Sequence, residues 1–115
     1  MHELSIAMHI MDIVSAEAEA AGAKGVNRIE LEIGLLSGVE PDAIQLAMEE
    51  AIVDTIASQA SVIFHWKKAV AVCEDCCKEF EPDDVFKICP YCNSLNTRLL
   101  TGKELKIKSI EVITE

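Results

Sequence analysis

The sequence has few basic residues, and this shortage limits the partners it can bind. Ten Lys and Arg stand against twenty Asp and Glu, which gives a formal charge of −10, and no segment is basic. A protein that binds phosphate groups relies on Lys and Arg to neutralise its partner. We therefore expect the protein to bind neither nucleic acid nor an anionic membrane surface.

The sequence also lacks a long hydrophobic run, and it has no cysteine outside one short stretch. No window approaches the roughly 18 apolar residues of a membrane span, and the chain does not begin with a basic export signal. All five cysteines lie between positions 73 and 92. Cysteines that cluster as CxxC pairs in a reducing compartment indicate metal or redox chemistry rather than disulfides. These features predict a cytoplasmic protein.

The 115 residues allow one domain, or one domain with a small satellite. Helical spacing of apolar residues predicts one helix over residues 4–21 and a second over 44–56, while alternation predicts strands over 28–33, 62–72 and 104–113. The order predicts an α+β fold: two helices packed on a small, mainly three-stranded sheet, with an inserted zinc-ribbon-like module.

The cysteine-containing segment interrupts this pattern of helices and strands. We expect a discontinuous α/β domain formed by residues 1–72 and 103–115, and a separate module over 73–102. If strands 62–72 and 104–113 pair as antiparallel neighbours, the module lies at the tip of a long hairpin.

The spacing of four cysteines predicts the metal in this module. Cys73 and Cys76 form one CxxC pair, and Cys89 and Cys92 form another after twelve intervening residues. Two such turns can converge on one tetrahedral ion, and four thiolates favour zinc in a closed, structural site. Cys77, which directly follows the first pair, is interpreted as a bystander thiol.

Two other functions are compatible with paired CxxC motifs. A zinc-ribbon adaptor or nucleic-acid-binding module would not need the N-terminal residues, although the basic face that nucleic acid requires is missing. A thiol oxidoreductase usually carries one CxxC motif at a helix N-terminus, whereas here two matched pairs compete for each other through a metal ion.

The N-terminal segment offers a different set of metal ligands. The amine of Met1, the amide nitrogen of His2 and the Nδ1 atom of His2 can form adjacent chelate rings, and a d⁸ nickel ion accepts such planar nitrogen sets. The positive end of a helix opposes a cation here, but carboxylates such as Glu3 or Glu40 can offset that effect. On these residues alone, a solvated His2 is the more common outcome.

Several features of the chain occur together in one known family: Met1-His2-Glu3 opening a helix, Ile33-Gly34 ending a strand, Glu40 before the second helix, and two CxxC pairs before an alternating C-terminal strand. Over its full length the chain resembles the HypA/HybF family of nickel metallochaperones. The resemblance implies a non-enzymatic role in delivering nickel for maturation of a nickel–iron hydrogenase, and in some organisms for urease. The implied partners are a nickel-binding GTPase and the hydrogenase large subunit.

The resemblance also assigns the two metals to residues of this sequence. His2 is implied as the principal nickel ligand, with the Met1 amine and the backbone of His2 and Glu3 as co-ligands, and with Glu40 as a further candidate. The zinc ligands implied are the same four thiolates, those of Cys73, Cys76, Cys89 and Cys92. No catalytic residue is expected, and the chain is expected to be a monomer or a weak homodimer.

Overall fold

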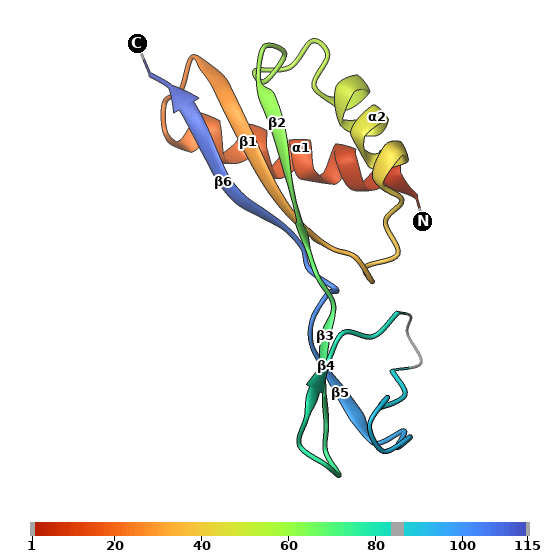
Figure 1. Cartoon of the computed structure of the whole chain (residues 1–115). Helices are drawn as coiled ribbons and strands as arrows, with labels where there is room; N and C mark the ends of the chain where they lie inside the picture. The colour runs from red at the N-terminus through yellow and green to blue at the C-terminus, as the bar shows by residue number, and fades with distance from the viewer. Residues whose placement is uncertain (1, 84–86, 115) are drawn as a thin grey trace. The chain divides into compact units, whose positions relative to one another are not determined.

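The structure is a computed structural model that describes residues 2–83 and 87–114 (Figure 1). Its elements, in chain order, are α1 (Glu3–Ala20), β1 (Gly25–Gly34), α2 (Pro41–Ala51), β2 (Ser61–Lys67), β3 (Val70–Cys73), β4 (Glu79–Phe80), β5 (Thr97–Thr101) and β6 (Leu105–Ile113). Two helices, a three-stranded sheet and a second small sheet around the cysteines confirm the predicted α+β class. Within the described residues, no helix is both long and apolar enough to cross a membrane.

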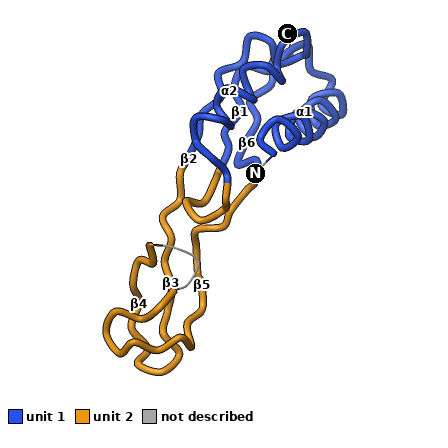
Figure 2. Tube along the Cα trace, turned by 90° about the vertical axis from the view of Figure 1, so that its right-hand side faces the viewer, with its two compact units in different colours: residues 1–31, 39–65, 106–115 blue, residues 32–38, 66–105 orange. Residues whose placement is uncertain are grey.

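The chain forms two compact units, coloured separately in Figure 2. Unit 1 comprises Met1–Leu31, Val39–His65 and Lys106–Glu115, and unit 2 comprises Glu32–Gly38 and Trp66–Leu105. Unit 2 contains the whole of the module predicted over 73–102. It also contains the end of β1 and the loop that follows it.

The core of unit 1 is aliphatic. In α1 the buried residues recur at helical spacing, and in β1 the buried Ile29 and Leu31 flank the half-buried Glu30. Pro41 occupies the first turn of α2, as predicted, and Ile44 and Met48 of that helix are fully buried. The buried residues of unit 1 are Ala7, Ile10, Met11, Val14, Ala18, Val26, Ile29, Leu31, Val39, Ile44, Ala47, Met48 and Ala57.

The larger sheet has the strand order β2-β1-β6. Side-chain pairs between β1 and β2 advance together, from Glu30–His65 to Glu32–Lys67, so these strands are parallel, with α2 in the connection. Pairs between β1 and β6 advance in opposite directions, from Arg28–Glu111 to Glu30–Ser109, so these strands are antiparallel.

The antiparallel pairing of strands 62–72 and 104–113, which was the condition for a long hairpin, is therefore not found for the first half of strand 62–72. The predicted strand is interrupted after Lys67: its first part is β2, and its second part is β3. The parallel β1–α2–β2 connection places β2 on one edge of β1, which leaves the other edge of β1 for β6. The second half of the predicted strand, β3, is antiparallel to β5, which lies just before the predicted partner strand 104–113 in the chain.

In unit 2, β3 is the central strand of the order β4-β3-β5. Ala71 is paired with Phe80 of β4, and Cys73 is paired with Thr97 of β5. The buried cluster is small: Ala71, Cys73, Phe80 and Cys89, with Cys76 and Leu99 packed against it. Since two of its four buried residues are cysteines, sulfur supplies much of what this cluster buries.

Two glycines of unit 2 allow their backbones to approach closely. A Cβ atom on Gly34 would overlap the backbone of Gly102, and a Cβ atom on Gly102 would lie 2.7 Å from the Cα atom of Ala69. Gly102 also has φ +122°, which side-chain-bearing residues rarely adopt. The Leu36 N–H donates a hydrogen bond to the Gly102 carbonyl across 2.7 Å. The loop after β1 is therefore packed tightly against the chain that enters β6.

Candidate metal-binding sites

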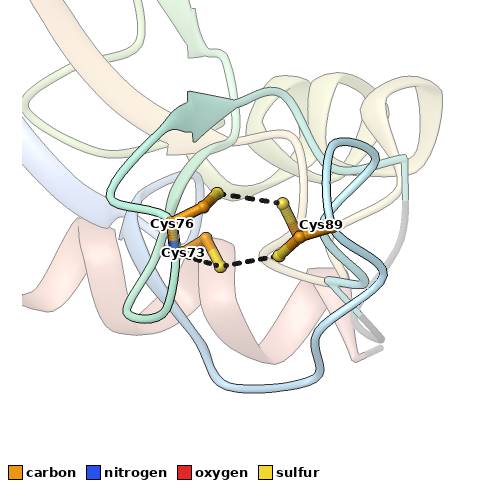
Figure 3. A group of neighbouring side chains, drawn as sticks. Cys73, Cys76 and Cys89 are labelled. Carbon is orange, nitrogen blue, oxygen red and sulfur yellow. Dashed lines mark hydrogen bonds between the residues drawn. The ribbon is translucent and has the colours of Figure 1, made fainter.

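Four cysteines of unit 2 bring their sulfur atoms together. The Sγ atoms of Cys73, Cys76, Cys89 and Cys92 all lie within 4.8 Å of one another. The Cys73 and Cys92 sulfurs are 3.5 Å apart. The Cys76 and Cys89 sulfurs are 3.7 Å apart, and Figure 3 shows them facing each other. None of these cysteines forms a disulfide.

Two similar turns position the four sulfurs. In the first turn the Cys77 N–H donates to the Cys73 carbonyl at 2.9 Å, and in the second the Asn93 N–H donates to the Cys89 carbonyl at 2.8 Å. Cys77 and Asn93 both have positive φ, 63° and 59°. Cys77 is exposed and does not belong to the group of four sulfurs. We call these two turns the first and the second knuckle.

The acidity of the thiols differs within the cluster. The Cys76 N–H donates to the Cys73 sulfur at 3.4 Å, and this bond, with smaller contributions from the Asp75 N–H and neighbouring sulfurs, lowers the pKa of Cys73 to about 7. The Ser94 N–H favours the Cys92 thiolate, but the adjacent Cys73 sulfur and burial outweigh it and raise the pKa of Cys92 to about 12. Neighbouring thiols cannot all ionise without a cation between them.

The geometry of the cluster fits a zinc ion. Zinc–sulfur bonds of about 2.3 Å in a regular tetrahedron require sulfur–sulfur distances of about 3.8 Å. The observed 3.5 and 3.7 Å are close to that value. Four sulfur ligands complete the tetrahedron and leave no position for a water molecule, so such a site is structural rather than catalytic.

The N-terminal candidates lie in unit 1, where the first turns of α1 and α2 are connected. The Glu40 N–H donates to Oε2 of Glu3 at 3.0 Å, and this bond lowers the pKa of the Glu3 carboxyl. Oε2 of Glu40 accepts a hydrogen bond from the Ala43 N–H at 2.6 Å and so caps α2. His2 is the exposed N-cap residue of α1, and Met1 lies outside the described residues.

The side chains of His2, Glu3 and Glu40 do not form a compact ligand group of the kind the cysteines form. Over residues 2–83 and 87–114, the four cysteines are the one group of at least three such side chains with converging ligand atoms. A chelate built from backbone nitrogens needs no such side-chain cluster, because the first N–H groups of a helix have no partner within the helix. The sequence did not predict the hydrogen bond from the Glu40 N–H to the Glu3 carboxylate. An acidic residue before Pro41 indicates the start of a helix, but it does not indicate a contact with Glu3.

Comparison with known proteins adds information about ancestry. A family model described as hydrogenase/urease nickel incorporation, metallochaperone, hypA matches residues 1–112. The hydrogenase maturation factor HypA of Parabacteroides distasonis is 41% identical over 115 residues and covers 100% of both chains. The HypA protein of Picosynechococcus sp. is 38% identical over 113 residues, 98% of this chain and 100% of that one.

The fold is also similar to solved structures. The solution structure of the Ni metallochaperone HypA from Helicobacter pylori superimposes with a TM-score of 0.71 at 24% sequence identity, and the match covers 100% of both chains. At this identity, the likeness establishes a shared fold.

Proposed function

We propose a function from the premise that the chain belongs to the HypA family of hydrogenase and urease nickel metallochaperones, whose model matches residues 1–112. The protein binds nickel(II) as cargo and delivers it during maturation of a nickel–iron hydrogenase. The full-length family match carries this proposal, and it favours the metallochaperone over the adaptor and oxidoreductase alternatives. A carrier of this kind performs no catalysis itself.

The zinc ligands in this proposal are Cys73, Cys76, Cys89 and Cys92. Support comes from sulfur–sulfur distances that suit a zinc tetrahedron and from the small core around the sulfurs. When bound, zinc supplies the cross-link that a unit with so few buried residues needs. The thiols must remain reduced to bind it, which favours the cytoplasm as the place of action.

The nickel ligands in this proposal are the Met1 amine, the backbone nitrogens of His2 and Glu3, and the His2 side chain. The exposure of His2 at the start of α1 supports it, since an exposed site can both accept an ion and release it. The Glu3 carboxylate, held by the Glu40 N–H, adds negative charge beside that helix end. Glu40 is proposed in the same supporting role, because one of its oxygens already caps α2.

The partners that fit this role are a nickel-binding GTPase, which would pass nickel to or from the protein, and the hydrogenase large subunit that receives it. Family membership supports a place in the maturation machinery. The excess of acidic residues is compatible with protein partners rather than nucleic acid.

Nickel titration tests the proposed cargo site. We expect the wild-type protein to bind one nickel ion, and both His2→Ala and a variant with one residue added before Met1 to lose at least about tenfold in affinity while keeping their zinc. His9→Ala is the matched control, because His9 is also an exposed histidine of α1. Equal nickel affinity in all four proteins, measured by calorimetry, would reject the N-terminal chelate.

A further inference from the structure

Outside the four sulfurs, one carboxylate connects the two knuckles of unit 2. Asp75 lies between the two cysteines of the first knuckle, and its Oδ2 atom accepts a hydrogen bond from the hydroxyl of Ser94. Its Oδ1 atom accepts a hydrogen bond from the side-chain amide of Asn96 at 3.2 Å. Ser94 and Asn96 directly follow the second knuckle, 19 and 21 residues along the chain from Asp75.

The partners of Asp75 are themselves fixed by the second knuckle. The Ser94 carbonyl accepts the Cys89 N–H at 3.0 Å, so Ser94 closes the turn that carries the cysteine. The Ser94 hydroxyl also accepts the Asn96 N–H at 3.0 Å. On the other side, the Glu74 N–H donates to the Asn96 carbonyl at 2.9 Å. A displacement of either knuckle would therefore break hydrogen bonds at Asp75.

These bonds join the knuckles without involving any sulfur atom. They can persist when the thiols are protonated, whereas the sulfurs hold the knuckles together only through a shared cation. Around a metal ion, hydrogen bonds beyond the ligands orient those ligands and tune how tightly the ion is held. A carboxylate that accepts two donors from the opposite knuckle is placed to do this.

We propose that Asp75 is a positioning residue for the four-cysteine site, acting with Ser94 and Asn96 as a clasp that keeps the two knuckles at metal-binding separation. The inference rests on the zinc site of the proposed function. The clasp slows release of zinc by keeping all four sulfurs in place when one zinc–sulfur bond opens. The clasp is largely exposed, so it contributes little to the stability of the unit and acts mainly on the metal.

Zinc release to a chromogenic chelator, followed on the full-length protein, tests the clasp. We expect Asp75→Ala to release zinc about tenfold faster than wild type. The effect should not be larger than this, because Asp75 is exposed. Asp75→Asn should restore slow release, since an amide can accept from Asn96 and donate to the Ser94 hydroxyl. Glu74→Ala is the matched control, because it removes the neighbouring carboxylate, which pairs with the exposed Arg98.

A second measurement separates positioning of the sulfurs from loss of stability. In cobalt-substituted protein, Asp75→Ala should shift the visible absorption bands of tetrahedral cobalt, and Asp75→Asn and Glu74→Ala should not. Gly34→Ala, which crowds the backbone of Gly102, weakens unit 2 outside the buried cluster that contains the sulfurs, and it should leave those bands unchanged. Its release rate calibrates the effect of lost stability alone.

The outcomes distinguish the two proposals. Wild-type protein that binds neither zinc nor cobalt through sulfur would overturn the zinc site, and the clasp with it. If zinc binds but Asp75→Ala matches wild type in release rate and absorption bands, the clasp alone is wrong. The clasp is also wrong if Asp75→Ala matches Gly34→Ala in both measurements.

Discussion

Unit 1 has an aliphatic core, whereas half of the buried residues in the small cluster of unit 2 are cysteines. The largest fully buried side chains of unit 1 are aliphatic, among them Ile29, Leu31 and Ile44, and they come from both helices and the sheet. In unit 2 the fully buried large side chains are those of Ile33, near the end of β1, and of Cys73 and Cys89. A hydrophobic core of aliphatic residues is stable by itself, whereas a core of thiols becomes stable when a metal ion joins them.

The proposed metals differ in the same way. Two of the four proposed zinc ligands, Cys73 and Cys89, are fully buried, so loss of zinc would remove part of the core. Nickel in unit 1 is proposed to bind at the exposed beginning of α1. The difference suits a resident ion in one case and a transferable ion in the other.

The largest expected effect comes from removing a buried sulfur ligand. Cys89→Ser should lose zinc and unfold unit 2, because structural zinc contributes on the order of 10 kcal/mol in small zinc-binding domains. Unit 1 should keep its protection from amide hydrogen exchange, since its core contains no cysteine. Cys77→Ser is the control and should behave like wild type, because Cys77 is exposed and outside the group of four. If Cys89→Ser lost its protection from hydrogen exchange in both units, the stability of unit 1 would depend on the zinc site, contrary to the difference between the two cores.

A smaller effect is expected where β1 continues into unit 2. Gly34→Ala would place a methyl group in the backbone of Gly102, and we expect unit 2 to lose about 3 kcal/mol of stability. Gly22→Ala provides the contrast: Gly22 has φ +67° and open space around it, so about 1 kcal/mol of conformational strain is expected. Regional hydrogen exchange under native conditions measures both. A Gly34→Ala protein as stable as wild type would show that the close approach is not needed.

The smallest effect is expected at the start of α2. Glu40→Ala removes the side-chain cap on the Ala43 N–H and should lower the stability of unit 1 by about 1 kcal/mol, with zinc content unchanged. Glu40→Asn should retain the cap and the stability, because asparagine is a favoured N-cap residue. Thermal unfolding followed by the α-helical circular dichroism signal distinguishes the two variants. A fall in zinc content in either variant would contradict the separation of roles between the units.

Local patterns predicted the elements and the main chemical groups. Helical spacing located α1 within two residues of its observed start, and the alternation around Glu30 located β1. Two CxxC pairs at a twelve-residue separation were sufficient to predict that four sulfurs converge. In each case the signal lies within a short stretch of chain, where the backbone geometry of a helix, strand or tight turn dictates the spacing of residues.

The tertiary structure decided what those elements touch. It placed β1 between β2 and β6, where the sequence had suggested a direct hairpin, because the edge of a strand accepts any partner that the connections bring to it. It brought the Glu3 carboxylate to the Glu40 amide, and Asp75 to Ser94 and Asn96. A single exposed carboxylate has no periodicity by which its partner can be recognised in the sequence. Such contacts depend on how distant segments pack, and that packing is a property of the whole chain.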